Sequence, residues 1–205
     1  LSDAPYKKTL NVLSKVINNS KIKLKHIDLG GGFGISYEKN NKEINLKEYA
    51  KLVHDFKKKL NCNIIFEPGR SLVGNSGILV SKIQYIKKGP NKYFIILDAG
   101  MNDFMRTALY EAKHEIIPIN KKSKKFSNAL EFVGPICEST CRFTAYNNYQ
   151  KISEGDFVAI TNTGAYGSSL SSNYNTRPLI AEILITKNKF KIIRKRQNLQ
   201  KLINA

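Results

Sequence analysis

The chain has 205 residues, enough for one domain or two small ones, and 41% of them are hydrophobic, which suffices for a sizeable core. No apolar run is long enough for a transmembrane helix, and Lys7 and Lys8 precede an amphipathic segment that does not resemble a signal peptide. The net charge of +18 comes from lysines spread along every segment, a pattern that argues against a clustered nucleic-acid footprint.

The first third of the chain alternates between helix and strand. Helices are predicted over 3–20, capped by Asp3, and over 46–60, capped by Asn45 with Glu48 three residues on. Their apolar faces are Leu10, Leu13, Val16 and Ile17 in the first helix and Tyr49, Val53, Phe56 and Leu60 in the second. Short strands are predicted over 26–29 and, buried, over 63–66. This order predicts a repeating α/β unit with parallel strands.

A glycine-rich loop, Asp28-Leu29-Gly30-Gly31-Gly32-Phe33-Gly34, follows the first strand. Backbone N–H groups with no Cβ in the way suit a phosphate, although a tight strand-to-loop turn would use the same residues. Ile35 stands where a dinucleotide fingerprint needs its third glycine, and no Walker-type Lys follows. Functional groups gather at the carboxyl ends of parallel strands, so we expect this loop and Glu67–Arg70 to meet over one site.

The remainder of the chain is predicted to be rich in strands. They are expected over 77–86, 93–97, 130–133, 157–161, 180–185 and 190–193, with a solvated loop over 121–125 and a closing helix over 197–203. The α/β part holds only two strands, and two parallel strands do not make a stable domain. We therefore expect another chain to complete it, or the sequence to be the C-terminal part of a longer protein.

The three cysteines, Cys62, Cys137 and Cys141, are too few for a disulfide framework, and their spacing matches no strong zinc motif. Free thiols, a reducing cytoplasm and no metal site are therefore expected. Cys62 and Cys141 are assigned to the core. The histidines at 26, 54 and 114 are assigned structural or surface roles.

Five segments carry motifs in a fixed order. They are DLGGGFGI (28–35), EPGRSLV (67–73), DAGMND with Arg106 and ALY (98–110), VGPICES (133–139), and GAYG continuing to SSNYN (164–175). Together they resemble the fold-type III pyridoxal-phosphate-dependent decarboxylases, and within that family the members that act on meso-diaminopimelate. The match covers nearly the whole chain, and each motif alone would be weak.

The resemblance implies an α/β plus all-β fold. Residues 1–74 would be the last part of an alanine-racemase-like (β/α)8 barrel that binds pyridoxal 5'-phosphate, and 75–205 a β-rich C-terminal domain closing over it. It also implies a cytoplasmic homodimer with shared active sites. The expected partner is a small-molecule substrate, with no nucleic acid and no membrane. The expected reaction is decarboxylation of meso-2,6-diaminopimelate to L-lysine and CO2.

The same resemblance implies roles for individual residues. The cofactor would be lined by Gly30, Gly31, Gly32, Glu67, Pro68, Gly69, Arg70 and Tyr166. The substrate would be held by Arg70, Arg106, Tyr110, Glu138 and Tyr166. An ionised Glu67 would keep the pyridine nitrogen protonated, and the thiol of Cys137 would return a proton to the substrate carbon. Arg106 and Tyr110, spaced i, i+4, would share a helix face.

Alternatives follow from the same residues. The alternative interpretations are a structural ion pair of Glu67 with Arg70, a surface arginine at position 106, and an inert buried thiol at Cys137. No lysine here stands in the context expected of the family's Schiff-base lysine, so we expect the chain alone to be inactive. A sister decarboxylase of ornithine, arginine or carboxynorspermidine and a non-catalytic relative remain the competing functions.

Overall fold

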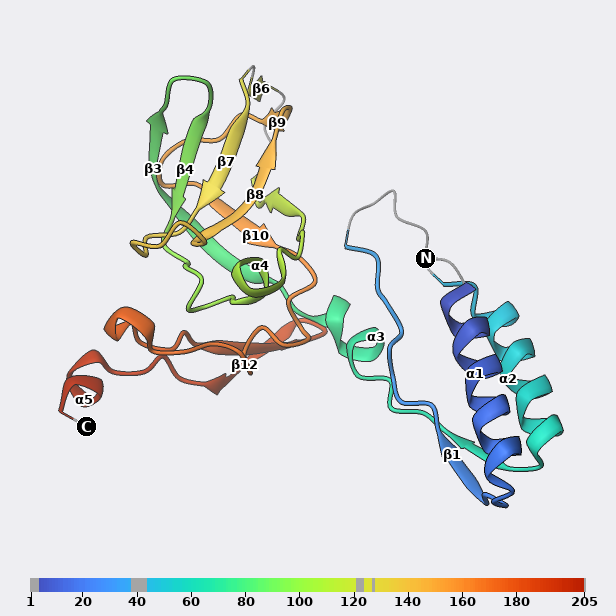
Figure 1. Cartoon of the computed structure of the whole chain (residues 1–205). Helices are drawn as coiled ribbons and strands as arrows, with labels where there is room; N and C mark the ends of the chain where they lie inside the picture. The colour runs from blue at the N-terminus through green and yellow to red at the C-terminus, as the bar shows by residue number, and fades with distance from the viewer. Residues whose placement is uncertain (1–3, 38–43, 121–123, 127, 205) are drawn as a thin grey trace. The chain divides into compact units, whose positions relative to one another are not determined.

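The computed structural model describes residues 4–37, 44–120, 124–126 and 128–204, and by compactness the chain divides into two units, Leu1–Asn75 and Ser76–Ala205. The first unit mixes helices and strands, and the second is built mainly of strands (Figure 1). The predicted combination of an α/β part and a β-rich part is confirmed. None of the described helices is long and apolar enough to cross a membrane.

The first unit contains two full helices and a small parallel sheet. Its elements are α1 (Ala4–Ser20), β1 (His26–Asp28), α2 (Leu46–Leu60), β2 (Asn63–Ile65), α3 (Arg70–Val73) and a 3₁₀ turn η1 (Gly74–Ser76). β1 and β2 pair in parallel with Ile27 opposite Ile64. The helices α1 and α2 lie side by side (Figure 1). The predicted parallel pairing is confirmed.

Local signals account for the limits of α2. The side chain of Asn45 accepts hydrogen bonds from the N–H groups of Lys47, at 3.1 Å, and Glu48, at 3.4 Å, so the predicted cap is confirmed. Asn61 ends the helix in the left-handed region, with φ of 47°. The predicted cap of α1, Asp3, lies outside the described residues.

Two burial predictions in the first unit are wrong. The core consists of Leu10, Ile27, Tyr49, Val53, Phe56 and Cys62. Val16 is 59% exposed. The side of α1 that faces the core runs through Leu10, Ser14 and Ile17, and successive helical residues are rotated by about 100°, so Val16 points away from the core. The strand at 63–66 is not buried either. Ile65 and Phe66 are 44% and 39% exposed, because among the described residues β2 has a paired strand on one side only.

A six-stranded sheet, in the order β5-β10-β3-β4-β7-β8, organises the second unit. The strands are β3 (Leu79–Lys88), β4 (Tyr93–Leu97), β5 (Ile116–Pro118), β7 (Leu130–Val133), β8 (Arg142–Tyr146) and β10 (Phe157–Ile160). All pairs are antiparallel except β4 with β7. Alternation in β3, with Leu79, Ser81 and Ile83 buried, directs one face into a core that includes Ile95, Leu97, Leu130, Phe132, Val158 and Ile160.

Several strands of this unit were not predicted. β5 ends in Pro118, β8 mixes polar and apolar residues, and the short pair β6 (Lys125–Phe126) and β9 (Tyr149–Gln150) spans two residues each. These segments lack a clear period, and the partners of β5 and of β6 are distant in the sequence. Of the predicted solvated loop, residues 121–123 lie outside the described residues, and Lys125 begins β6.

A separate two-stranded hairpin follows the six-stranded sheet in the sequence. β11 (Glu182–Thr186) and β12 (Lys189–Arg194) pair antiparallel, and α5 (Leu199–Ile203) closes the described chain. Both strands and the closing helix were predicted. Successive apolar residues of β11, Ile183, Leu184 and Ile185, are at least half exposed, as is Phe190 of β12 at 76%. Side chains alternate between the faces of a strand, so both faces of the hairpin expose apolar surface.

Candidate functional site

The glycine loop and the segment that follows β2 meet, as predicted. The N–H of Glu67 donates to the carbonyl of Gly30 at 2.9 Å, and a Cβ placed on Gly31 would collide with the carbonyl oxygen of Glu67. Gly30 and Gly32 have φ of +66° and +75°, which favours glycine at both positions. The absence of side chains therefore lets the two strand ends approach backbone to backbone.

The loop offers fewer free donors than the sequence suggested. The N–H of Gly30 donates to Oδ1 of Asp28 at 2.7 Å, which removes it from a phosphate. Among the described residues, nothing accepts from the N–H groups of Gly31 and Gly32. The carbonyl of Gly32 accepts from the hydroxyl of Tyr6 at 3.0 Å, which holds the loop against α1. Two backbone donors thus remain available for an anion.

Glu67 and Arg70 do not neutralise each other. Glu67 is exposed, and Nη1 of Arg70 points to the hydroxyl of Tyr37 at 3.5 Å, with the guanidinium 6.0 Å from that ring's centroid. No ion pair joins Glu67 and Arg70 in the described part of the chain, so the interpretation of Glu67 as Arg70's structural partner is wrong. Both charges are therefore available to a ligand.

In the second unit, Arg106 and Tyr166 come together. Arg106 opens the short helix α4 (Arg106–Tyr110), is 5% exposed, and its guanidinium carbon lies 5.6 Å from the centroid of the Tyr166 ring. The interpretation of Arg106 as a surface arginine is therefore wrong. Tyr166 has φ of +65°, a costly conformation for a non-glycine residue and one that is frequent at functional sites. Its ring is half exposed, so it covers Arg106 while facing solvent.

Tyr110 differs from Arg106 in its environment. The helix expected from the i, i+4 spacing is present, but Tyr110 is 63% exposed and Arg106 is buried. The helix is only five residues long, and Glu111 ends it in the left-handed region. Shortly after α4 in the sequence, His114 packs edge-on against Phe104, with 4.6 Å between ring centroids, and its Nδ1 lies 2.9 Å from the carbonyl of Thr161. Burial, reinforced by the Arg106 charge and opposed by the Thr161 contact, lowers the pKa of His114 to about 4.

Cys137 and Glu138 project from a tight turn between β7 and β8. The turn is closed by hydrogen bonds from the N–H of Gly134 to the carbonyl of Cys141 at 2.8 Å and from the N–H of Cys141 to the carbonyl of Glu138 at 3.0 Å. Cys137 is exposed, whereas Cys62 and Cys141 are buried. The core assignment of Cys62 and Cys141 is confirmed, and the interpretation of Cys137 as a buried inert thiol is wrong. Oε1 of Glu138 accepts a short hydrogen bond from the hydroxyl of Tyr174.

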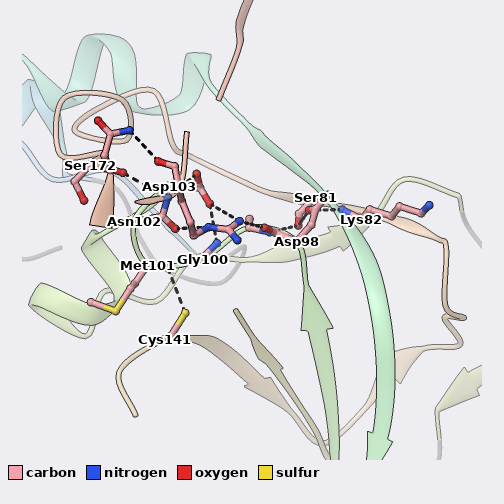
Figure 2. A network of polar contacts seen from close by, with 12 residues as sticks. Ser81, Lys82, Asp98, Gly100, Met101, Asn102, Asp103, Cys141 and Ser172 are labelled. Carbon is pink, nitrogen blue, oxygen red and sulfur yellow. Dashed lines mark hydrogen bonds and ion pairs between the residues drawn. The ribbon is translucent and has the colours of Figure 1, made fainter. Parts of the chain in front are cut away.

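A polar network holds the loop that follows β4 (Figure 2). Asp98 accepts from Ser81 at 2.5 Å and from the N–H of Lys82 at 2.9 Å, and Asp103 accepts from the N–H of Gly100 at 2.9 Å. The N–H of Met101 donates to Sγ of Cys141 at 3.4 Å. Because the backbone of Cys141 also closes the turn that carries Cys137, this hydrogen bond ties that turn to the loop.

Sequence reasoning missed the central cation of this network, Arg177. Its Nε donates to Oδ1 of Asn102 at 3.1 Å, its Nη2 to the carbonyl of Asp98 at 2.5 Å, and it lies 3.8 Å from Asp103. Burial raises the pKa of Asp103, an effect that hydrogen bonding to Gly100 and the charge of Arg177 oppose. Arginine is scarce beside lysine in this chain, and that signal, which singled out Arg106, applied equally to Arg177.

The fold and these residues define a class of protein. Residues 10–164 match the family model described as "Pyridoxal-dependent decarboxylase, C-terminal sheet domain". The chain belongs to the pyridoxal-dependent decarboxylase family.

The relatives that match this chain at about 40% identity are diaminopimelate decarboxylases. A diaminopimelate decarboxylase of Aquifex aeolicus is 39% identical over 201 residues, covering 97% of this chain and 48% of that protein. One from Helicobacter pylori is 44% identical over 181 residues, covering 88% and 44%. The crystal structure of a Helicobacter pylori diaminopimelate decarboxylase complexed with L-lysine has a TM-score of 0.82 and 40% identity, over 97% of this chain and 48% of that one. The chain thus spans about half the length of the relatives it matches.

Proposed function

We propose that this chain is the C-terminal half of a pyridoxal-phosphate-dependent decarboxylase that converts meso-2,6-diaminopimelate to L-lysine and CO2. The observation that carries the proposal is the contact between the glycine loop and Glu67, which brings two N–H donors without acceptors among the described residues close to a segment whose Glu67 and Arg70 side chains form no ion pair with each other. Residues 1–74 would contribute the last part of a (β/α)8 barrel, and 75–205 the β domain.

The residues of the first unit fit the cofactor. The N–H groups of Gly31 and Gly32 can bind its phosphate, and the carboxylate of Glu67 can hold a proton on its pyridine nitrogen. When bound, pyridoxal phosphate supplies a ring that takes up the electron pair left by departing CO2. Arg70 can pair with a carboxylate or phosphate through two parallel N–H donors, which an ammonium cannot do.

The second unit supplies groups suited to a substrate with two amino-acid ends. Arg106 is buried, and its guanidinium lies against the half-exposed ring of Tyr166, so a substrate carboxylate that approaches this ring could pair with a weakly hydrated guanidinium. We assign the distal end of the substrate to Arg106 and Tyr110. The carboxylate of Glu138 can pair with the distal ammonium.

The thiol of Cys137 is the proposed proton donor. It is exposed on a closed turn, so it can meet a substrate without being consumed by a disulfide in this chain. The S–H bond breaks as a C–H bond forms at the carbon that has lost CO2, and the thiolate then regains a proton from solvent. We further propose that the complete enzyme is a cytoplasmic homodimer with shared active sites, and that the lysine that carries the cofactor lies outside this chain.

The test is the decarboxylation of meso-diaminopimelate by the complete enzyme loaded with pyridoxal phosphate. Cys137→Ala should lower kcat by about 10²–10⁴-fold while the absorbance of the bound cofactor is unchanged. Ser139→Ala, at an exposed neighbour on the same turn, is the matched control and should retain activity. Unchanged turnover in Cys137→Ala would remove the thiol from the reaction. Faster turnover of ornithine than of diaminopimelate would overturn the proposed substrate, and a sedimentation mass of one chain would overturn the dimer.

A further inference from the structure

Tyr174 is a tyrosine outside every role assigned so far, and it contacts a proposed substrate residue. It begins the 3₁₀ turn η2 (Tyr174–Thr176), and its hydroxyl donates to Oε1 of Glu138, 36 residues away in the sequence. The ring is 46% exposed, so the hydrogen bond is formed at the surface from which Cys137 and Glu138 project.

The turn that carries Tyr174 is held from both sides. Nδ2 of Asn173 donates to the carbonyl of Arg177 at 2.8 Å and to Oε1 of Gln197 at 2.5 Å. The N–H of Ser172 donates to the carbonyl of Asn102 at 2.9 Å, which joins the turn to the network of Figure 2. Arg177 completes the connection through its contacts with Asn102 and Asp98. The position of the Tyr174 hydroxyl is thus set by side chains from three separate segments.

Backbone strain indicates that this turn is maintained for a purpose. Asn175 and Thr176 both have φ of 56°, and Thr176 is β-branched, for which the left-handed region is especially costly. Such residues persist where the surrounding contacts over-determine the backbone, and they concentrate at functional sites. The hydrogen bonds of Asn173 and Arg177 described above are the contacts that hold Asn175 and Thr176 in this conformation.

The chemistry of a phenol suits the positioning of a carboxylate that must remain charged. A tyrosine hydroxyl donates one hydrogen bond and adds no charge, whereas a lysine or arginine would neutralise Glu138. With Oε1 occupied, Oε2 and the full negative charge remain for a cation. The hydrogen bond to Glu138, and secondarily its charge, raise the pKa of Tyr174, so the hydroxyl keeps its proton at neutral and mildly alkaline pH.

We propose that Tyr174 is a positioning residue that orients Glu138 so that its second oxygen receives the distal ammonium of the substrate. This inference rests on the proposed function, because the ammonium belongs to diaminopimelate. The nearby surface would accordingly discriminate against substrates that lack a charged amine at that end.

The first test is a double-mutant cycle in the complete, cofactor-loaded enzyme. Tyr174→Phe should raise KM for meso-diaminopimelate by about tenfold with kcat changed less than twofold, since one hydrogen bond to a charged group is lost. In the Glu138→Gln background the same substitution should change KM less than twofold. Tyr85→Phe, at an exposed tyrosine of β3, is the control and should have no effect. An equal effect of Tyr174→Phe in both backgrounds would show a merely structural role and overturn the proposal.

The second test needs no turnover. In enzyme labelled with ¹³Cζ-tyrosine, the Tyr174 resonance, assigned by its loss in Tyr174→Phe, should titrate at lower pH in Glu138→Gln than in the unchanged protein. An unchanged titration would refute the hydrogen bond on which the proposal depends. If the pairing is observed but diaminopimelate is not decarboxylated, the proposed function fails together with the assignment of the ammonium, while failure of the cycle alone refutes only the role of Tyr174.

Discussion

In the first unit the predicted cofactor contacts are largely backbone groups at the end of a two-stranded sheet, whereas in the second the predicted catalytic and substrate contacts are side chains carried by a six-stranded sheet. The glycine loop presents N–H groups that no side-chain truncation can remove. Cys137, Glu138, Arg106 and Tyr166 depend on hydrogen bonds and ring contacts from segments distant in the sequence. The two units should therefore lose their sites under different perturbations.

Acid should distinguish the units most strongly. His114 is buried in the second unit, whereas His26 and His54 of the first are exposed. The folded pKa of His114, about 4, is below its usual value, so the unfolded chain binds more protons between about pH 4 and 6.5. Stability is therefore fully present above about pH 6.5 and falls as the pH drops towards 4, by up to about 3 kcal/mol. Hydrogen exchange of β3, β4 and β10 between pH 7 and 4 would measure the loss.

The control for this prediction is His114→Asn, which keeps a donor near the Thr161 carbonyl but cannot titrate. Its stability should depend less on pH between 4 and 6.5 than that of the unchanged chain. Equal pH dependence in the two proteins would show that another group carries the acid sensitivity.

Adding one carbon should break the backbone site of the first unit. Gly31→Ala places a Cβ against the carbonyl of Glu67, and neither backbone can yield cheaply, so we expect a loss of about 1–3 kcal/mol in stability and weaker cofactor binding. Gly69→Ala is the matched control for stability alone, because no atom lies within 4 Å of its Cβ and its φ is −90°, whereas cofactor binding by Gly31→Ala is compared with that of the unchanged protein. Thermal unfolding and a pyridoxal phosphate titration measure both effects. Equal thermal stability of the two variants would contradict the close approach.

Loss of one cation should loosen the second unit without unfolding it. Arg177→Met removes two hydrogen bonds and an ion-pair contact, so we expect a loss of about 1–2 kcal/mol and faster hydrogen exchange over 98–103 and 172–177. Arg142→Met, at an exposed arginine of β8, should leave both unchanged. If exchange accelerates only elsewhere in the sheet, Arg177 does not hold these two segments together.

The smallest change in stability is expected at the hairpin β11–β12. Phe190→Lys should alter the free energy of unfolding by less than about 0.5 kcal/mol, because the side chain is 76% exposed. It should nevertheless reduce self-association of the chain, since it interrupts an apolar surface. Val16→Lys adds the same charge at an exposed apolar residue of α1 and should leave association unaltered. Sedimentation at several concentrations provides the comparison, and equal association of both variants would exclude the hairpin.

Local patterns were enough to predict much of the fold. α2 follows from its cap at Asn45 and its apolar period, and β4 and β7 follow from short apolar runs. The five motifs were enough to predict the family. β5 and β8 could not be predicted, because a strand without a clear period is stabilised by the strands beside it. For β5, the neighbouring strand β10 lies 30 or more residues further along the chain.

Part of the chemistry of the site could likewise be predicted from the sequence, and part depends on the folded structure. Residue type and strand-end position indicated the glycine loop and the segment Glu67–Arg70, and the family resemblance indicated the roles of Glu67 and Cys137. The donation of Gly30 to Asp28, the contrast between buried Arg106 and exposed Tyr110, and the contact of Tyr174 with Glu138 emerge only from the folded chain. Each depends on where distant segments place their atoms, and hydrogen bonds and burial are properties of that placement and not of local sequence.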